Sequence, residues 1–271
     1  MDYIGLICFF ISLVLSYICL PMIKEMLLKS NIVCENFRDI KIPTSLGLVF
    51  VFVQVITLGS VEIMFNFSDN FNLIYLLGFS FIGMLGILDD LIGEKRVKGL
   101  RGHIKALFSG VLTTGGIKAI LGLFISIIVS NYISVTFKDF IINSLIIGLF
   151  TNLINMFDLR PGRATKVFAI FALLFILSGF IREKSYIIYS LFGILIPYIR
   201  LDLKAMAMMG DVGSNVLGFT LGILAAISFT FEFRIIILIL LIVFHVLAER
   251  ISFSNIIDNN KVLKYFDSLG R

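Results

Sequence analysis

Long apolar runs separated by short polar segments form the main pattern of this 271-residue chain. A helix of about 20 predominantly apolar residues is long enough to cross the hydrocarbon core of a bilayer. The chain contains nine such runs, at about residues 3–23, 46–65, 71–88, 105–130, 139–157, 165–181, 185–200, 212–230 and 234–249. Thr113-Thr114-Gly115-Gly116 and Lys118 interrupt the fourth run, and the seventh is short, with Pro197 near its end. The pattern predicts one all-α polytopic membrane domain covering residues 1–271, with about nine transmembrane helices.

The composition supports this prediction and excludes other classes of protein. Hydrophobic residues make up 59% of the chain and charged residues 15%, and the mean hydropathy is +1.03. The basic residues lie in short clusters between apolar runs, which is typical of loops beside anionic lipid and argues against nucleic-acid binding. Cys8, Cys19 and Cys34 lack the spacing of a metal site, so we expect neither zinc nor a disulfide.

The basic residues also predict the orientation of the chain. When successive loops are assigned alternately to the two sides of the membrane, eighteen Lys and Arg residues fall on one side and four on the other. Loops rich in Lys and Arg usually face the cytoplasm. We therefore expect a multi-pass plasma-membrane protein with its N-terminus outside and its C-terminus in the cytoplasm.

Polar side chains gather at the predicted cytoplasmic ends of three spans. They are Asp89 and Asp90 after the third, Asn152, Asn155 and Asp158 at the end of the fifth, and Asp211 and Ser214 at the start of the eighth. Ionisable groups at such positions are costly and often functional. Magnesium usually takes one or two carboxylates together with substrate phosphates, and basic side chains neutralise phosphate charge. The pattern predicts a cytoplasmic magnesium- and phosphate-binding cleft.

Each motif by itself also fits a structural role. The two asparagines, three residues apart, could hydrogen-bond between helices. Asp211 could simply interact with the dipole at a helix N-terminus. The convergence of all three motifs on one membrane face favours the functional interpretation.

The order of the motifs resembles the polyprenyl-phosphate N-acetylhexosamine-1-phosphate transferase superfamily. The motifs are Asp89-Asp90, Gly99-Leu100-x-x-x-x-Lys105, Asn152-x-x-Asn155-x-x-Asp158 and Met209-Gly210-Asp211-x-Gly213-Ser214, within a resemblance from Lys41 to Gly218. The resemblance implies transfer of a sugar 1-phosphate from a UDP-sugar to undecaprenyl phosphate in the membrane, with release of UMP, as the first step of a cell-envelope glycan. Enzymes of this superfamily commonly dimerise, so a homodimer is one expectation.

The resemblance also implies roles for individual residues. Asp211 would bind Mg2+, and Asp89 and Asp90 would line the reacting centre, one of them as the base. Lys105 would contact phosphate. The donor's nucleotide and diphosphate would lie against Asn152, Asn155 and Asp158, with Asp158 counted as catalytic. We also expect Ser214 to bind substrate, together with Arg160 and Arg163, two arginines that enter beside the expected donor site.

The chain departs from the family on the donor side. After Asp158 it continues Leu159-Arg160-Pro161-Gly162-Arg163 in place of the usual Asp-Gly-x-x-Gly-Leu. It also lacks the histidine-rich motif of the last cytoplasmic loop and the final span of the peptidoglycan enzyme. The magnesium and acceptor carboxylates are retained, so we expect a UDP-sugar other than the muramoyl-pentapeptide donor.

Two alternative functions stay open at this point, and so does the role of residues 250–271. The chain could be a catalytically silent homologue that binds the carrier lipid or acts as a scaffold. A transporter is less favoured, because transporter sites usually lie at the membrane midplane. The amphipathic residues 250–271 could form a helix on the membrane surface, or Arg250, Ser252 and Ser254 could cap the donor site.

Overall fold

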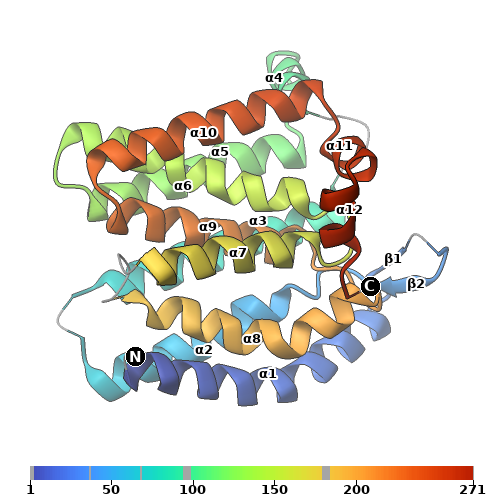
Figure 1. The fold of residues 1–271 in the computed structure, drawn as a ribbon, viewed down its shortest axis with the longest axis horizontal. Coiled ribbons are helices and arrows are strands. Elements are labelled where there is room, and N and C mark those ends of the chain that lie inside the picture. The colour runs from blue at the N-terminus through green and yellow to red at the C-terminus, as the bar shows by residue number, and fades with distance from the viewer. Residues whose placement is uncertain (1–2, 37, 68, 94–98, 179–183, 271) are drawn as a thin grey trace.

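The computed structural model describes residues 3–36, 38–67, 69–93, 99–178 and 184–270, and it is almost entirely helical (Figure 1). Its elements are α1 Tyr3–Lys29, β1 Val33–Glu35, β2 Lys41–Pro43, α2 Leu48–Phe65, α3 Phe71–Ile92, α4 Gly99–Phe108, α5 Thr114–Ile133, α6 Phe137–Phe157, α7 Arg163–Ser178, α8 Tyr186–Leu203, α9 Gly210–Ser228, α10 Phe231–Arg250, α11 Phe253–Asn259 and α12 Lys261–Ser268. Within the described residues, eight helices are long and apolar enough to cross a membrane, namely α1, α2, α3, α5, α6, α8, α9 and α10. The predicted all-α polytopic membrane fold is confirmed.

Helix α7 corresponds to the predicted span 165–181 and runs alongside the long helices (Figure 1). Its 16 described residues rise about 24 Å, which is less than the ~30 Å of a typical hydrocarbon core. Phe168, Ala172 and Phe175 bury one side of α7 in the bundle. The first and last described residues lie at opposite ends of the bundle (Figure 1). This requires an odd number of crossings, which the eight long helices give only together with α7. The assignment of one end to the cytoplasm remains a prediction from the basic loops.

The predicted start of the fourth span, at residue 105, is wrong. Residues 99–108 form the separate helix α4, and the chain turns at Gly110, whose φ is +77°. Helix α5 begins only at Thr114, because the Thr113 side chain caps it by accepting the Gly116 N–H at 3.1 Å. The Thr-Thr-Gly-Gly segment is therefore a helix start, and Lys118 lies in the second turn of α5.

A two-stranded hairpin between α1 and α2 was not predicted from the sequence. Strands β1 and β2 pair antiparallel, with Val33 opposite Pro43. Just after β2, the backbone N–H groups of Leu46 and Gly47 donate to the carbonyls of Met208 and Met209 at 3.0 and 2.9 Å. The hairpin connection is therefore fastened to the segment that leads into α9.

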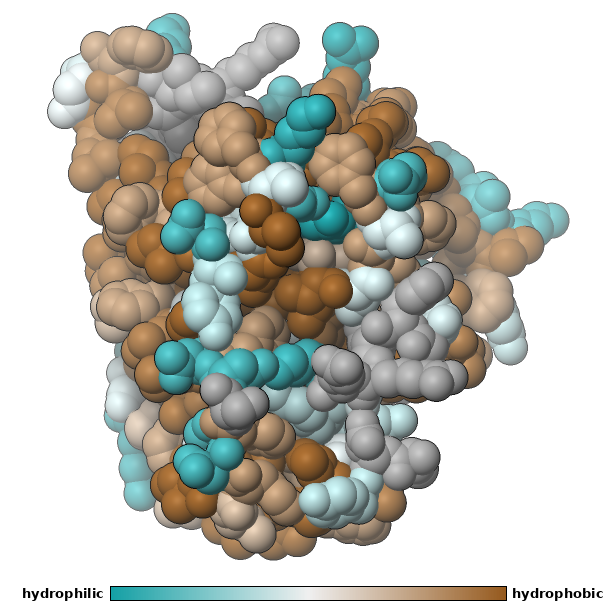
Figure 2. Space-filling view, turned by 90° about the vertical axis from the view of Figure 1, so that its left-hand side faces the viewer, coloured by the Kyte–Doolittle hydropathy of each residue, from teal (hydrophilic) through white to brown (hydrophobic). Residues whose placement is uncertain are grey.

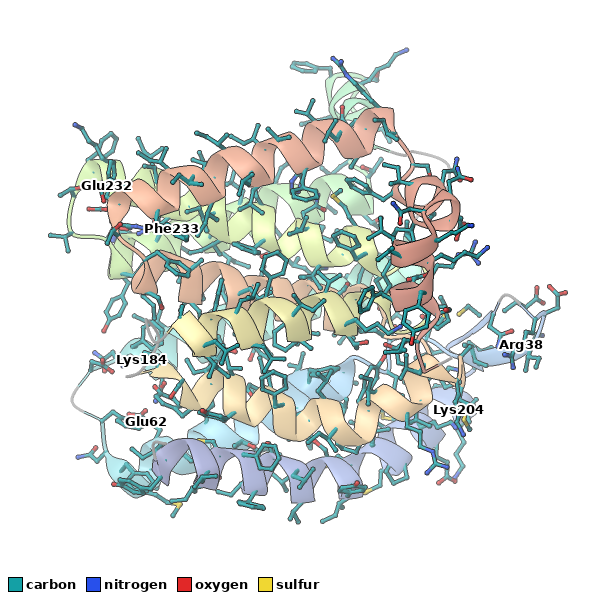
Figure 3. The ribbon with its side chains drawn as sticks, viewed as in Figure 1. Arg38, Glu62, Lys184, Lys204, Glu232 and Phe233 are labelled. Atoms are coloured by element: carbon teal, nitrogen blue, oxygen red, sulfur yellow. The ribbon has the colours of Figure 1, made fainter. Side chains whose placement is uncertain are left out.

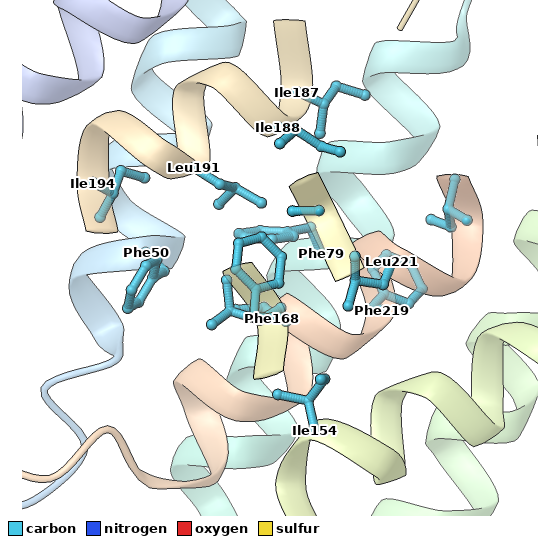
Figure 4. Close-up of a cluster of buried hydrophobic side chains, with 14 of the residues drawn as sticks. Phe50, Phe79, Ile154, Phe168, Ile187, Ile188, Leu191, Ile194, Phe219 and Leu221 are labelled. Carbon is cyan, nitrogen blue, oxygen red and sulfur yellow. The ribbon is translucent and has the colours of Figure 1, made fainter. Parts of the chain in front are cut away.

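Helix α9 forms the centre of the bundle, and fifteen of its 19 residues are buried. It packs closely on α6 because glycines face that helix: a Cβ on Gly218 would lie 2.3 Å from the Phe150 carbonyl oxygen, and one on Gly222 2.6 Å from the Ile147 Cα. Small residues allow this close approach of membrane helices. Buried side chains of α2, α3, α6, α7, α8 and α9 fill the surrounding core (Figure 4).

Charged side chains mark the two ends of the bundle. Arg38 and Lys204 lie at the end that carries the hairpin and α12, whereas Glu62, Lys184 and Glu232 lie at the opposite end (Figure 3). Figure 2 looks onto that opposite end, where hydrophilic side chains interrupt the apolar surface. On α10, Leu241 is the one buried residue among the 20 that the structure describes there, so most of its apolar surface is free to contact lipid. The grouping of Arg38 with Lys204 at one end, and the place of Lys184 at the other, agree with the sides to which the sequence assigned these loops.

Candidate active site

Helices α3 and α9 approach each other closely where α3 ends and α9 begins. A Cβ on Gly86 would lie 2.5 Å from the Val212 N and Cα atoms, so only glycine allows the two backbones this near. Asp89 and Asp90 follow in the next turn of α3. The close approach places both carboxylates beside the first turn of α9, which contains Asp211.

Asp90 is held by the start of α9 and by the hairpin connection. Its Oδ1 accepts the Asp211 backbone N–H at 2.9 Å, and its Oδ2 accepts the Ser45 hydroxyl at 2.7 Å. A helix N-terminus favours a negative charge, and Gly210 has a φ of +73° with no room for a Cβ beside the Asp90 carboxylate. Asp90 therefore links three segments, α3, the residues after β2, and α9. Sequence reasoning missed Ser45, because a serine after a strand gives no signal of its own.

Lys118 reaches from α5 to two of the carboxylates. Its Nζ lies 2.8 Å from Asp89 Oδ2 and also hydrogen-bonds Asp211 Oδ2. The side chains of Lys118, Asp89 and Asp211 are 22%, 19% and 25% exposed, so this cation neutralises two partly buried anions. Sequence reasoning treated Lys118 only as an interruption of a span. The available signal was a lysine inside an apolar span, where an unpaired charge is costly and a partner is expected.

Asn155 completes this cluster, which we call the acid cluster and define as Asp89, Asp90, Lys118, Asn155 and Asp211. With its amide oriented to satisfy both polar atoms, Asn155 donates from Nδ2 to Asp211 Oδ1 at 2.9 Å and accepts at Oδ1 from Lys118 Nζ at 3.2 Å. Ser214 lies beside it, because the Asn155 amide nitrogen is 3.0 Å from Ser214 Oγ. The structure thus brings together residues of α3, α5, α6 and α9.

Asn152 does not join the acid cluster. Its side chain is exposed and its amide nitrogen lies 3.6 Å from Met156 Sδ on the same helix. Residues three apart on a helix are separated by about 60° around its axis, so Asn152 and Asn155 share a side of α6 without pointing at the same place. Asn152 remains a predicted donor contact.

Asp158 lies at the C-terminal cap of α6, next to the acid cluster, and lines a cavity of about 290 Å³. Burial and the negative charges of Asp202, Asp211 and Asp90 raise the pKa of Asp158 well above its usual range, whereas a hydrogen bond from the Gly210 backbone opposes this shift. The cavity is also lined by Glu35, Asn36, Arg160, Asp202 and Met209. Because Met209 directly precedes Gly210 and Asp211, the cavity adjoins the acid cluster.

The two arginines of the 159–163 segment have different surroundings. Arg160 is exposed and lines the cavity, and its contact with a donor stays a prediction. Arg163 is only 4% exposed, and its guanidinium pairs with Asp267 at 2.8 and 3.0 Å and donates to Ser254 Oγ at 3.0 Å. These contacts do not support the prediction that Arg163 contacts substrate, because its guanidinium is already paired with Asp267 of α12. Ser254 likewise binds Arg163, so helices α11 and α12 are fastened to the end of α7 (Figure 1).

Asp202 is a further carboxylate that sequence reasoning missed. It is 3% exposed, and it accepts the Gly162 N–H at 3.0 Å and the Thr165 hydroxyl at 3.1 Å. These bonds shape the segment after Asp158, where the chain departs from the family pattern. The available signal was the position of Asp202 just after the predicted span 185–200, at its predicted cytoplasmic end.

Lys105 lies apart from the acid cluster. It is exposed on α4, which projects from the bundle (Figure 1). Its predicted contact with phosphate therefore depends on a substrate that reaches α4. The neighbouring basic residues Lys95, Arg96 and Lys98 lie outside the described residues.

The donor atoms around Lys118 are suited to a hard metal ion. Within the part of the chain that the structure describes, no three Asp, Glu, His or Cys side chains are arranged to hold a metal. Carboxylate oxygens of Asp89 and Asp211 and the Asn155 amide oxygen do surround one cation, the Lys118 ammonium. Oxygen ligands of this kind are those that Mg2+ prefers. The residues fit magnesium in chemical type, at a position that Lys118 occupies.

Comparison with known proteins agrees with this geometry. Residues 72–230, which include the whole acid cluster, match the model of glycosyl transferase family 4. Curated relatives include two phospho-N-acetylmuramoyl-pentapeptide-transferases from strains of Clostridium perfringens. One is 27% identical over 264 residues, covering 88% of this chain and 76% of the relative. The other is 28% identical over 264 residues, covering 88% and 78%. Because the family match spans more than half of the chain, this protein belongs to glycosyl transferase family 4, within the polyprenyl-phosphate hexosamine-1-phosphate transferase superfamily.

Proposed function

We propose that this protein transfers a sugar 1-phosphate from a UDP-sugar to undecaprenyl phosphate at the cytoplasmic face of the plasma membrane, in a magnesium-dependent reaction that begins a cell-envelope glycan. One observation carries the proposal. Three carboxylates and a lysine from α3, α5 and α9 converge at one end of a membrane bundle, beside a cavity, in a family 4 chain. This end is the one that the basic loops assign to the cytoplasm.

The reaction exchanges one phosphoanhydride bond for another. An oxygen of the acceptor phosphate bonds to the β-phosphorus of the UDP-sugar, and the bond from that phosphorus to the bridging oxygen breaks. UMP leaves with the electron pair of the broken bond. The second pKa of a phosphate monoester is about 6, so the acceptor is largely dianionic at neutral pH and needs little help from a base.

Positioning and charge neutralisation then carry most of the catalysis. We assign Asp211, with Asp89 and Asn155, to hold the divalent cation, which would neutralise diphosphate charge when bound. Asp90 fixes the first turn of α9 through its bond to the Asp211 N–H, and Ser45 holds the Asp90 carboxylate from the other side. These contacts set the place of the reacting groups.

We place the donor in the cavity next to Asp158. The cavity volume of about 290 Å³ is near the lower end for a small-molecule pocket. The cavity therefore holds part of a UDP-sugar, and the rest of the donor extends towards the acid cluster. Arg160 supplies positive charge at the cavity wall. Leu159, Arg160 and Pro161 of the altered segment line this cavity, which supports a donor other than the one used by the muramoyl-pentapeptide transferases.

The test is UMP release by the purified protein in detergent, supplied with undecaprenyl phosphate, magnesium and a panel of UDP-sugars. We expect release with one donor, abolished by EDTA and reduced at least about 100-fold by Asp211→Asn. Asp258→Asn removes an exposed carboxylate on α11 and serves as the matched control. Release that survives both EDTA and Asp211→Asn would contradict the proposal.

A second candidate function is a catalytically silent homologue that binds the carrier lipid or acts as a scaffold. The observation that favours it is Lys118, whose ammonium occupies the position between Asp89 and Asp211. Carrier-lipid binding without UMP release from any donor would support this candidate, and donor-dependent release would exclude it.

A further inference from the structure

Lys118 lies at the centre of the acid cluster. The catalytic and metal-binding roles proposed above do not include it. Its ammonium contacts Asp89 Oδ2, Asp211 Oδ2 and, at 3.2 Å, the Asn155 oxygen. These three oxygens come from α3, α9 and α6, whereas Lys118 comes from α5. One cation therefore ties together four helices.

The same oxygens are the ones that fit a divalent metal ion. Two cations cannot occupy one place, and each would repel the other at such short range. Without any cation, Asp89 and Asp211 would be two partly buried carboxylates facing each other, which is costly. Lys118 removes that cost when no metal is bound.

We propose that the Lys118 ammonium is a resident counter-ion that competes with the divalent cation for Asp89, Asp211 and Asn155, so that metal binding requires Lys118 to move away. The identity of the metal and its use in catalysis rest on the proposed function, whereas the competition follows from the contacts. The cluster stays assembled between metal-binding events because one cation replaces the other.

The competition can be measured without any substrate, with Mn2+ as the probe. Free Mn2+ is quantified by electron paramagnetic resonance as it is titrated into the purified full-length protein. By removing the competing ammonium, Lys118→Met lowers the dissociation constant for Mn2+ by about tenfold or more, within the range of coupled binding equilibria. Asp211→Asn added to Lys118→Met abolishes this binding.

Two further variants make the result specific. Lys204→Met removes an exposed lysine at the same end of the bundle, so it keeps the wild-type Mn2+ affinity within about twofold. Lys118→Gln removes the charge but retains a hydrogen-bond donor, and it reproduces the tighter binding if Lys118→Met does not fold. The melting temperature supplies a second readout, because Mn2+ raises it more in Lys118→Met than in the wild type.

Equal or weaker Mn2+ binding in folded Lys118→Met and Lys118→Gln would overturn the inference. The two measurements distinguish a failure of this inference from a failure of the proposed function. Tighter Mn2+ binding without UMP release leaves the competition standing and removes the transferase, whereas magnesium-dependent UMP release with unchanged Mn2+ binding does the reverse.

Discussion

The contact between Gly86 and the first turn of α9 offers a sharp test, because it links the packing of the bundle to the proposed site. Gly86→Ala would place a Cβ 2.5 Å from the Val212 N and Cα atoms and 2.6 Å from the Asp211 carbonyl carbon. These are backbone atoms, so no rotamer change relieves the overlap. To reach an ordinary contact of about 3.4 Å, α3 and α9 have to separate by about 0.9 Å.

The separation has two measurable consequences. Overpacking of this kind typically costs ~1–3 kcal/mol of stability. The hydrogen bond from the Asp211 N–H to Asp90 Oδ1, now 2.9 Å, would lengthen to about 3.8 Å, which is beyond hydrogen-bonding distance. A displacement of about 1 Å at a reacting centre can cost ~100-fold in rate, so we expect a loss of UMP release of that order.

Gly59→Ala is the matched control. A Cβ on Gly59 meets no atom within 4 Å, so this change adds helix propensity to α2, worth up to ~1 kcal/mol, without overlap. Both variants are compared by UMP release and by thermal unfolding in detergent. Activity of Gly86→Ala within about twofold of that of Gly59→Ala, together with an equal melting temperature, would show that the added Cβ does not separate α3 from α9.

Two further predictions concern the segment around the cavity. The raised pKa of Asp158 means that its ionisation destabilises the folded state increasingly as the pH rises above the unfolded value, and that the full penalty is present above the folded pKa. Asp158→Asn, which still accepts the Gly210 N–H, should therefore raise the melting temperature at pH 8, and this gain should shrink towards pH 4; a gain independent of pH would contradict the assignment. Asp267→Asn leaves the buried Arg163 guanidinium without its carboxylate and should cost about 3 kcal/mol or more. In thermal unfolding, combining it with Arg163→Met should cost less than the two single losses together, and strictly additive losses would show that the pair does not interact.

Local chemistry determined much of the fold. The apolar runs set the spans, and where cap residues flank them the boundaries are sharp, as at α6, where Thr136 and Asp139 form a capping box. The start of the fourth span was misplaced because residues 105–112 continue an apolar run, although Thr113 and Gly110 act locally to end one helix and begin the next. The hairpin was missed because its three-residue strands give too short a pattern.

The candidate site was only partly determined by local sequence. Asp89, Asp90, Asn155, Asp158 and Asp211 were found because polar groups at membrane ends are costly and therefore conspicuous. Their assembly depends on close helix contacts that no local pattern specifies.

Long basic side chains show this limit most clearly. Lys118 and Arg163 each carry a charge that the sequence reveals, but its partner depends on helix rotation and on segments far away in the chain. Lys118 turned out to face two carboxylates of other helices, and Arg163 pairs with Asp267, 104 positions away.

Hydrophobic length and the cost of burying charge act residue by residue, so the amino-acid sequence was enough to predict a helical membrane protein with Asp89, Asp90, Asp158 and Asp211 at one end. Which charges meet depends on how the helices pack. Glycine contacts such as Gly86 with Val212 set the helix spacing, and that spacing determines whether a lysine pairs with a carboxylate or remains free for a substrate.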